Sequence, residues 1–445
     1  MTDLSGLEAC LRQLNSAVQS IVTHENHALL FPTSPRVSQA HANALDSNEP
    51  DSARELALAS LAKLQIMLSR PADILQQMTL QAQLLACIQW LGEFQILACI
   101  PLNGTAVIRD ISDLIRVPET QLARIIRVTS LGGFLEEPTP GHVAHSSLSA
   151  AFVAKPSYLD AAMFLARTAA PVAQEMAAAT KQARDEPHPA RPRAPQDVAL
   201  HHRFFKNADG LELPRLQRQW QAYIRYGLGY HCDTATDILT CLGALPVDAA
   251  PVVEVSARST ERVLALANKY PWLQLVVQLG SPHSAPNSST NKNGPPGPRL
   301  RQSRIQVQHR VPGTPQRINN AAVYIINFPI PDPVATWTSL MAELDSELRA
   351  HLPVMVERPA AMLVLTIPAL PEQGTIREDL GVGSRLRDLS LMQLANEREH
   401  DMSEVIGLLS GLGDGKGRLV LVNKVRSGGR DGAVALEIKY QSYPE

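Results

Sequence analysis

The chain has 445 residues, of which 45% are hydrophobic and 19% are charged, and its formal net charge is -2. This composition is typical of a globular protein, and the length exceeds that of one hydrophobic core, so we expect two or more domains. The small net charge excludes binding of polyanions through bulk electrostatics. Any contact with nucleic acid would therefore need a local basic patch or a partner protein.

Cysteine usage and the N-terminus favour an intracellular protein. The cysteines are scattered, and no pair has the C-x-x-C spacing of a metal site: Cys10, Cys87, Cys99, Cys232 and Cys241. We expect reduced thiols and no zinc cluster. The N-terminus lacks the basic and apolar runs of a signal peptide. The most apolar stretch, residues 84–100, is too short and too polar to span a membrane, so we expect no membrane association.

Apolar residues at helical spacing predict a helix over residues 4–22, which is a candidate for packing across a subunit boundary. Its apolar face consists of Leu4, Leu7, Leu11, Leu14, Val18 and Ile21. A polar stretch over 24–54 reads as a linker. Helical patterning resumes at 55–69 and, after Pro71, at 72–98.

The next segment has the order helix, helix, hairpin. A short helix is predicted at 110–115 and a second at 121–131, and strands at 134–137 and 142–146 form a hairpin. This order is typical of a winged helix-turn-helix domain. Further helices extend to about 182, a proline-rich linker follows over 183–210, and helical patterning returns at 211–231.

A strand–turn–helix–strand unit follows, and its turn lacks glycine. Val252–Val255 reads as a buried strand, residues 256–260 as a tight turn, 262–270 as an amphipathic helix, and 273–277 as a second strand. Glycines normally allow such a turn to approach a dinucleotide or nucleoside ligand. A residue with a Cβ in glycine-only geometry costs about 1–3 kcal/mol. We therefore expect that the turn has relaxed and that ligand binding has been lost.

Strand signals continue to the end of the chain, at 305–307, 322–326, 361–365, 418–422 and 433–438. Helices separate most of them, as in a doubly wound α/β sheet. The last two strands are predicted to form an antiparallel hairpin that closes the sheet edge. The segment 280–303 is rich in Ser, Pro, Asn and Gly and is expected to be disordered.

Over residues 55–440 the chain resembles the class I S-adenosylmethionine-dependent O-methyltransferases of fungal natural-product pathways. The matching blocks are 83–94, 133–137 and 387–394. Blocks 83–95, 97–102 and 140–146 look more specifically like the methyltransferase-like coactivators of aflatoxin- and anthraquinone-type polyketide clusters. The resemblance implies that the winged domain serves in dimerisation, and that the protein works with a zinc-cluster transcription factor rather than as an enzyme.

The resemblance also implies where a methyltransferase would keep its functional groups, and these positions have changed. Glu254 preserves the acid before the turn, but Gln278-Leu279 stands where a second acid should bind the ribose. The general base should be a histidine, and the corresponding residues are Pro331-Asp332-Pro333. His351 and His400 are substitute candidates, although a surface or partly buried structural role is more common for such histidines. We assign no catalytic, cofactor-binding or metal-binding residue.

Two basic features of the sequence are candidate contacts with nucleic acid. Arg116, Arg124 and Arg127 flank or lie on the second helix of the winged domain, but Glu119, Glu136 and Glu137 lie beside them and disfavour DNA binding. Between Arg262 and Pro331 the chain has no acid and eight basic residues: Arg262, Lys269, Lys292, Arg299, Arg301, Arg304, Arg310 and Arg317. A solvated loop is favoured over a contact with phosphate or an acidic partner.

The sequence thus predicts a Rossmann-like class I methyltransferase sheet preceded by a helical, winged helix-turn-helix domain. The expected divisions are an N-terminal helix and linker (1–54), a winged-helix and dimerisation domain (55–182), a linker (183–210) and a degenerate α/β domain (211–445). The predicted function is a homodimeric, non-catalytic coactivator without cofactor, which binds a zinc-cluster transcription factor and touches DNA only through it. We expect it in the nucleus, with the cytoplasm as a second location. An O-methyltransferase acting on an aromatic polyketide, and a chaperone-like subunit for a biosynthetic enzyme, are the alternatives.

Overall fold

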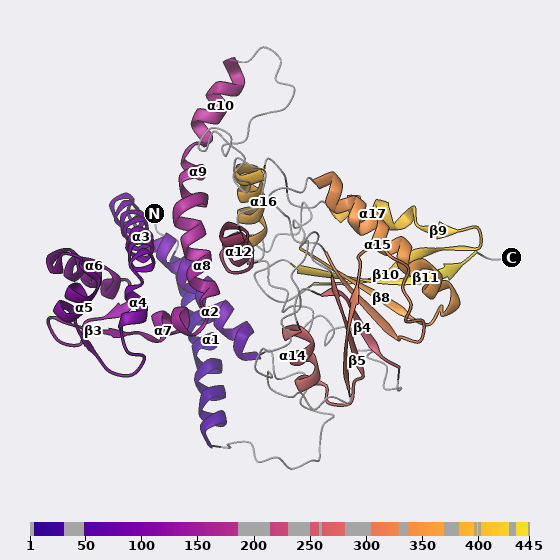
Figure 1. Ribbon diagram of the computed structural model, residues 1–445, viewed down its shortest axis with the longest axis horizontal. Coiled ribbons are helices and arrows are strands. Elements are labelled where there is room, and N and C mark those ends of the chain that lie inside the picture. The colour runs from indigo at the N-terminus through magenta and orange to yellow at the C-terminus, as the bar shows by residue number, and fades with distance from the viewer. Residues whose placement is uncertain are drawn as a thin grey trace. The chain divides into compact units, whose positions relative to one another are not determined.

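A computed structural model shows two compact units (Figure 1). It describes residues 4–30, 49–185, 214–229, 250–257, 260–280, 304–328, 337–368, 382–395, 398, 402–426 and 433–443. The first unit comprises Met1–Ser16, Leu56–Tyr230 and Leu386–Glu397. The second comprises Ala17–Glu55, His231–Arg385 and Arg398–Glu445.

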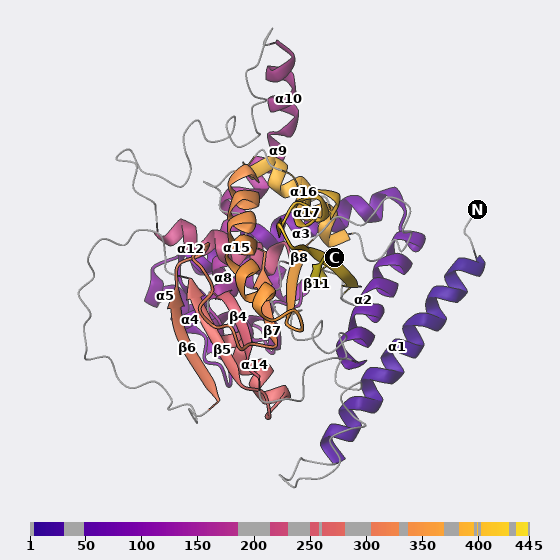
Figure 2. The same cartoon turned by 90° about the vertical axis from the view of Figure 1, so that its right-hand side faces the viewer.

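Two long helices begin the chain, α1 (Leu4–Leu30) and α2 (Glu49–Leu68). The expected linker over 24–54 is therefore wrong at both ends, because the helices extend into it. The two helices lie side by side (Figure 2), and the thiol of Cys10 on α1 donates to the carbonyl oxygen of Ser60 on α2 at 3.3 Å. The buried side chains of these two helices are mostly small, which allows helices to approach closely: Cys10, Ala17, Ala53, Ala57 and Ser60, together with Leu64.

The helix predicted at 72–98 is broken in two. α3 (Pro71–Glu93) begins at a proline, as helices often do, and α4 (Ile96–Cys99) follows. Gln95 separates them with a φ of 53°, a left-handed backbone conformation that ends the helical hydrogen-bond ladder. Gly92, in the last turn of α3, is the local signal beside this break, but the apolar pattern continues through it and predicts one helix.

The helix–helix–hairpin order predicted for residues 110–146 is present. The helices are α5 (Ile108–Ile115) and α6 (Glu119–Leu131), and the hairpin strands are β2 (Leu135–Glu136) and β3 (His142–His145). A strand that the sequence analysis missed, β1 (Ala106–Val107), pairs with β3 and gives the sheet order β1-β3-β2. Fully buried apolar side chains, including Leu122 and Ile126 on α6, hold these elements together.

Helices complete the first unit. They are α7 (Ser147–Ala154), α8 (Ser157–Phe164), η2 (Leu165–Ala169), α9 (Ala170–Gln174), α10 (Met176–Asp185), α12 (Pro214–Ala222), η3 (Tyr223–Gly227) and α16 (Val382–Ala395). The segments η2 and η3 are π-helical. An aromatic cluster joins α8 to α12 and η3, because the ring of Phe164 lies 5.4 Å from that of Trp220 and 5.1 Å from that of Tyr223.

The second unit contains an eight-stranded sheet in the order β6-β5-β4-β7-β8-β11-β10-β9. Its strands are β4 (Val252–Ala257), β5 (Leu275–Gly280), β6 (Ile305–Arg310), β7 (Val323–Asn327), β8 (Met362–Pro368), β9 (Gly413–Asp414), β10 (Gly417–Arg426) and β11 (Ala433–Ser442). The five strands from β6 to β8 are parallel, and β11, β10 and β9 are antiparallel. The predicted strands and the terminal hairpin are confirmed. Gly280, expected to begin a disordered segment, ends β5, and 281–303 lie outside the described residues.

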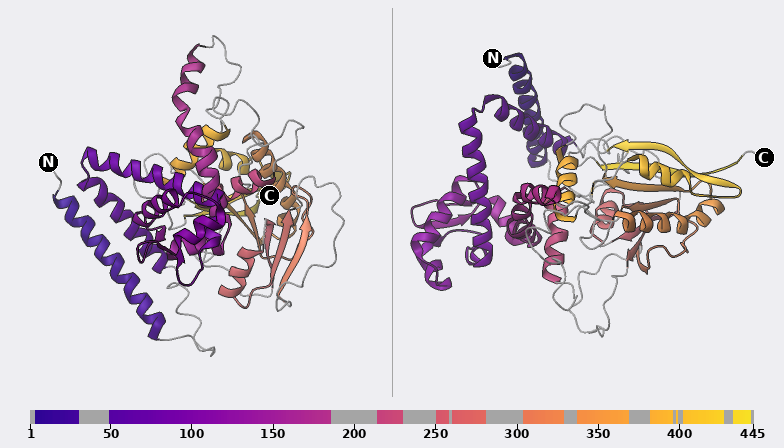
Figure 3. Two further views of the ribbon diagram at one scale, coloured as in Figure 1. Left: turned by 60° about the vertical axis from the view of Figure 1, so that its left-hand side comes forward. Right: turned by 90° about the horizontal axis from the view of Figure 1, so that it is seen from above.

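Helices cover both faces of this sheet (Figures 1 and 3). The helices α15 (Trp337–Glu357) and α17 (Met402–Ser410) pack on one face, and α14 (Glu261–Lys269) packs on the other. Because both faces are buried, the inner strands are continuous apolar runs rather than alternating ones, which is why the sequence revealed them clearly. The predicted fold class, an α/β sheet of the class I methyltransferase kind, is confirmed by this order and by the comparisons below.

Candidate functional site

The chain reverses its direction of travel across the sheet at β4. From β4 it proceeds outward through β5 to β6, and it then returns to the other side of β4 to form β7 and β8. In open α/β sheets a ligand binds at such a switch point, beyond the carboxyl ends of the strands. The residues at the ends of β4, β5 and β7 therefore constitute the candidate cofactor site.

The turn after β4 begins with Ser256, whose φ is 53°. This left-handed conformation is the one that glycine adopts without cost, and for a serine it costs about 1–3 kcal/mol. The expectation that the turn had relaxed is therefore wrong at Ser256, because the backbone keeps the glycine-type geometry with a Cβ in place. Arg258 and Ser259, further along the turn, lie outside the described residues. The backbone at Ser256 consequently gives no argument for loss of the ligand.

Polar side chains from three neighbouring strands meet beside this turn. Glu254 on β4 is 2% exposed, and one of its carboxylate oxygens accepts a hydrogen bond from Nδ2 of Asn327 on β7 at 3.3 Å. The Oδ1 atom of Asn327 in turn accepts from the hydroxyl of Thr366 on β8 at 2.8 Å. The acid that the sequence analysis found preserved is thus part of a chain of hydrogen bonds across β4, β7 and β8.

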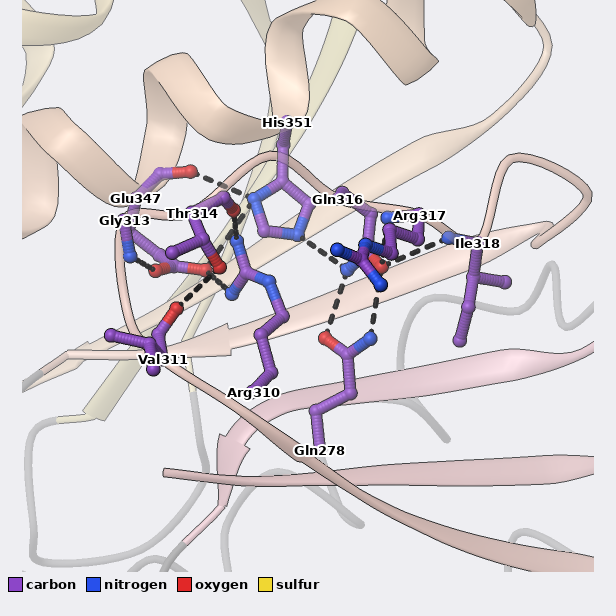
Figure 4. A network of polar contacts seen from close by, with 10 residues as sticks. All are labelled: Gln278, Arg310, Val311, Gly313, Thr314, Gln316, Arg317, Ile318, Glu347 and His351. Carbon is purple, nitrogen blue, oxygen red and sulfur yellow. Dashed lines mark hydrogen bonds and ion pairs between the residues drawn. The ribbon is translucent and has the colours of Figure 1, made fainter. Parts of the chain in front are cut away.

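Gln278, on β5, forms a reciprocal pair with Gln316 in the β6–β7 connection (Figure 4). Nε2 of Gln278 donates to Oε1 of Gln316, and Nε2 of Gln316 donates back to Oε1 of Gln278, each at 2.9 Å. Oε1 of Gln316 also accepts from the backbone N–H groups of Arg317 and Ile318 at 3.0 and 3.1 Å. Both glutamines are buried. The sequence analysis placed Gln278 after the second strand, whereas the structure places it inside β5, two residues before the strand ends. Its side chain is committed to the protein interior.

The same network includes His351 on α15, which is completely buried. Its Nε2 lies 3.1 Å from Nε2 of Gln316, and its Nδ1 lies 2.7 Å from the carbonyl oxygen of Glu347. Since the amide nitrogen of Gln316 is a donor, Nε2 of His351 is the acceptor and Nδ1 carries the proton. Burial lowers the pKa of His351 to about 4. The ring is neutral, and both of its nitrogens are engaged by the protein.

An ion pair between Arg310 on β6 and Glu347 on α15 adjoins the histidine, and both side chains are more than nine-tenths buried (Figure 4). The second oxygen of Glu347 accepts from the backbone N–H of Gly313 at 2.6 Å, and Arg310 also donates to the carbonyl oxygen of Thr314. Gly313 has a φ of 74°, and a Cβ there would come within 2.3 Å of the hydroxyl of Ser346. Only glycine fits this turn.

These contacts show whether the candidate bases and the basic loop predicted from the sequence are free to act on a ligand. The expectation that His351 is a surface or partly buried histidine is wrong, and a substrate proton cannot reach its engaged nitrogens. His400 and Pro331-Asp332-Pro333 lie outside the described residues. Arg310 is no part of a solvated basic loop, because it is buried against Glu347.

Two charges on the winged segment compensate each other. Arg127, on α6, lies 3.6 Å from the carboxylate of Glu137 at the hairpin. Arg116 and Arg124 are exposed. The pairing of Arg127 agrees with the sequence argument that acids beside this helix disfavour contact with phosphate.

Within the described ranges, no group of three or more His, Cys, Asp and Glu side chains is arranged to hold a metal ion. No helix there is long and apolar enough to cross a bilayer. The network around Gln316 and Glu347 was not foreseen, because its members are 34 to 38 residues apart in the chain. Only Glu347 and His351, four residues apart, have a spacing in the sequence that predicts neighbouring side chains on a helix.

Comparison with known proteins gives no matching family model, but close relatives exist. A transcriptional coactivator of the agnestins biosynthesis cluster from Paecilomyces divaricatus is 53% identical over all of both chains. A transcriptional coactivator from Aspergillus aculeatus is 48% identical over 95% of this chain and 100% of its own. A coactivator of the monodictyphenone cluster from Emericella nidulans is 41% identical over 100% of this chain and 99% of its own.

Solved structures share the fold at low sequence identity. The structure of LepI in complex with SAM has a TM-score of 0.60 and 13% identity, and the match covers 96% of this chain and 100% of that one. OxaC in complex with SAH and oxaline has a TM-score of 0.55 and 16% identity, with 97% and 100% covered. These likenesses establish the fold alone. Together with the relatives, they show that the chain belongs to the family of methyltransferase-like transcriptional coactivators of fungal secondary-metabolite gene clusters.

Proposed function

We propose that this protein is a non-catalytic coactivator that binds a pathway-specific zinc-cluster transcription factor and promotes expression of a fungal polyketide cluster of the aflatoxin or anthraquinone type. The names of the relatives from the agnestins and monodictyphenone clusters support the coactivator role. The five scattered cysteines cannot form a zinc-cluster DNA-binding module. The partner would therefore supply the contact with DNA, and the nucleus would be the main location, with the cytoplasm second.

The pairing of Gln278 with Gln316 is the observation that carries the non-catalytic part of the proposal. A class I fold that binds a nucleoside uses an acidic side chain near the second strand to accept hydrogen bonds from the ribose hydroxyls. Gln278 is neutral, buried and bonded through both of its amide atoms at 2.9 Å. Freeing it for a ligand would leave the buried amide of Gln316 without these bonds, at a cost of about 1–3 kcal/mol.

Calorimetric titration with S-adenosylmethionine tests this part. We expect no binding up to millimolar ligand, under conditions in which an active O-methyltransferase of the same fold binds at micromolar concentrations. Micromolar binding by this protein would overturn the non-catalytic reading. The titration should be repeated with a Ser256→Gly variant. If this variant also shows no binding, the Cβ at the turn is not the only feature that prevents binding of S-adenosylmethionine.

Co-purification tests the partner. The full-length chain, tagged and isolated from producing cells, should bring down a zinc-cluster transcription factor. The same factor should bind the purified protein in the absence of DNA, and the purified protein alone should give no shift of promoter DNA. Recovery of a biosynthetic enzyme in place of a transcription factor would favour the chaperone-like alternative.

One observation favours a second candidate, an O-methyltransferase acting on an aromatic polyketide. Ser256 keeps the left-handed backbone of a ligand-binding turn, and Glu254 lies on β4 two residues before it. An enzyme would nevertheless need a proton acceptor. Among the described residues, the candidate His351 is fully buried. Transfer of a labelled methyl group to an aromatic acceptor would establish this function, and the titration above would already have detected its cofactor.

A further inference from the structure

The strand β6 forms one edge of the large sheet (Figure 2), and among the described residues it pairs only with β5. The backbone N–H of Leu275 on β5 donates to the carbonyl oxygen of Arg304 at 2.9 Å, which fixes the parallel ladder. In this register the even-numbered residues of β6 bond to β5, and the odd-numbered residues direct their N–H and C=O groups the other way. Ile305, Val307 and His309 therefore point their backbone donors and acceptors away from the sheet.

This edge is open to solvent and lacks the usual protection. Gln306, Val307 and His309 are exposed, and Val307 is 46% exposed. Proteins commonly protect an edge strand with lysine, proline or a β-bulge, because free N–H and C=O groups pair with other chains. The sequence of β6 contains no lysine or proline, and its register with β5 is unbroken. A strand of this kind is suited to accept a further strand.

The opposite edge of the same sheet is protected. There β10 carries Lys424, and an extra residue, Val422, interrupts its register with β11. The short strand β9 covers the beginning of β10. Val422 is 53% exposed, so exposure of an apolar side chain does not distinguish the two edges. What distinguishes them is protection against strand pairing, which β10 has and β6 lacks.

The charge around β6 indicates which kind of strand can pair with it. From Arg262 to Pro331, a range that includes β5 and β6, the sequence has no acid. Arg304 directly precedes β6, is exposed, and takes part in none of the ion pairs among the described residues. A second copy of β6 would bring no carboxylate to Arg304, whereas an acidic segment would supply one. Charge complementarity therefore favours an acidic partner over a second copy of this chain.

We infer that the outer edge of β6 accepts an extended, acidic segment of the partner protein as an additional strand. Backbone hydrogen bonds to Ile305, Val307 and His309 hold the segment, and Arg304 pairs with its carboxylates. An extended chain is required, because only a strand repeats its donors and acceptors at the spacing found along β6. The inference rests on the proposed function, which supplies a protein partner, and it adds the surface and the chemistry of the contact.

Photo-cross-linking in producing cells identifies the occupant. The full chain with Val307→p-benzoylphenylalanine should attach one segment of the partner protein, and mass spectrometry should show that this segment has an excess of acids. Val422→p-benzoylphenylalanine is the matched control, because Val422 is similarly exposed on the protected edge and should not attach that segment. The inference is overturned by attachment of a second copy of this chain, by a segment without excess acid, by the same segment at both positions, or by no attachment.

Binding of the attached segment, as a synthetic peptide, to the purified full chain tests the mode of pairing. Val307→Pro removes an outward N–H and keeps the ladder to β5, so binding measured by fluorescence anisotropy should weaken at least about tenfold. Val307→Thr keeps the N–H and is the matched control, which should bind like the unaltered protein. Arg304→Glu should also weaken binding, and this effect should shrink as salt is added. Circular dichroism should show all three variants equally folded.

Unaltered affinity in both Val307→Pro and Arg304→Glu would overturn the inference. This failure is distinguishable from failure of the proposed function. If a zinc-cluster transcription factor co-purifies equally with the unaltered protein and with Val307→Pro, the proposed function stands and the β6 edge is not the contact. If the acidic segment attached at Val307 belongs to a biosynthetic enzyme, the edge is confirmed and the proposed partner is wrong.

Discussion

The interior network around Gln316 and the exposed leucines of α2 (Leu58, Leu61 and Leu68) depart from ordinary protein architecture in opposite ways. The network buries polar and charged groups, whereas α2 exposes apolar ones. Each glutamine and the imidazole of the network has its partner inside the same unit, at distances from 2.7 to 3.1 Å. The leucines of α2 are 46% to 64% exposed.

A buried network stabilises the fold of the chain itself, whereas an exposed apolar surface is suited to contact with another molecule. A buried polar network whose members satisfy one another stabilises one arrangement of a core and needs nothing from outside. Exposed apolar residues at helical spacing are stabilised only when something covers them. Mutations in the network should therefore change the free energy of unfolding of the single chain, and mutations of the exposed leucines should change it little.

The largest effect is expected for Glu347→Ala. The substitution leaves Arg310 as an uncompensated charge that is 8% exposed, which should lower the free energy of unfolding by about 3–5 kcal/mol. Urea denaturation measures the loss. Asp345→Ala on the same helix is the matched control, because its pair with Arg349 at 2.8 Å is largely solvent-exposed and should contribute at most about 1 kcal/mol. Equal losses in the two variants would contradict the role of the buried pair.

The pH dependence of stability should carry the signature of His351. Its pKa is lowered from 6.5 to about 4 in the folded protein, chiefly by burial, so the unfolded chain binds the proton first as the pH falls. Stability should decrease by about 3 kcal/mol between pH 6.5 and 4, and this contribution should be constant below pH 4. Urea titrations of the unaltered protein and of His351→Gln across this range isolate it, because carboxylates contribute to both. Parallel curves would refute the assignment.

Removing one member of the amide pair should have an intermediate effect. Gln278→Leu deprives the buried amide of Gln316 of two hydrogen bonds, and we expect a loss of about 1–3 kcal/mol in the free energy of unfolding. Gln274→Leu is the control, because Gln274 lies just before β5 with an exposed side chain. Its effect should stay within about 0.5 kcal/mol. The interpretation fails if denaturant midpoints of the two variants coincide.

The smallest effect is expected at the turn after β4. Ser256→Gly should raise the free energy of unfolding by about 1 kcal/mol, because relief of the left-handed strain exceeds the entropy that glycine loses on folding. Ser256→Ala keeps the Cβ and should give no gain. Thermal unfolding of the two variants decides the point, and a stabilised alanine variant would show that strain is not the cause.

The sheet was predictable because its signal is local. Each inner strand is buried on both faces, so Val323–Ile326 is apolar at every position and Val252–Val255 is apolar except at Glu254. The break at Gln95 and the strain at Ser256 were not predictable, because glutamine and serine rarely adopt a positive φ and neither residue therefore indicates one. The partners of Gln278 were also beyond the sequence, since they approach only when the β6–β7 connection folds over the sheet.

The N-terminal helix shows a different limit of prediction from the sequence. The sequence identified an apolar face that includes Leu4, Leu11 and Val18, and these side chains remain 69%, 42% and 43% exposed. The buried face is made of small residues such as Cys10 and Ala17, which hydrophobic periodicity weighs little. Periodicity finds apolar stripes, but it does not reveal which stripe is covered within one chain.

The amide pair also bears on whether an acidic side chain could be introduced at this position by mutation. A carboxylate introduced at Gln278 would replace an N–H donor with an oxygen, opposite Oε1 of Gln316 and in a position that is 2% exposed. Two acceptors would then face each other in a dry environment, and the new acid would hold its proton at neutral pH instead of offering a charge to ribose. A single substitution that places an acid at Gln278 would thus disturb Gln316 as well, so both residues would have to change together.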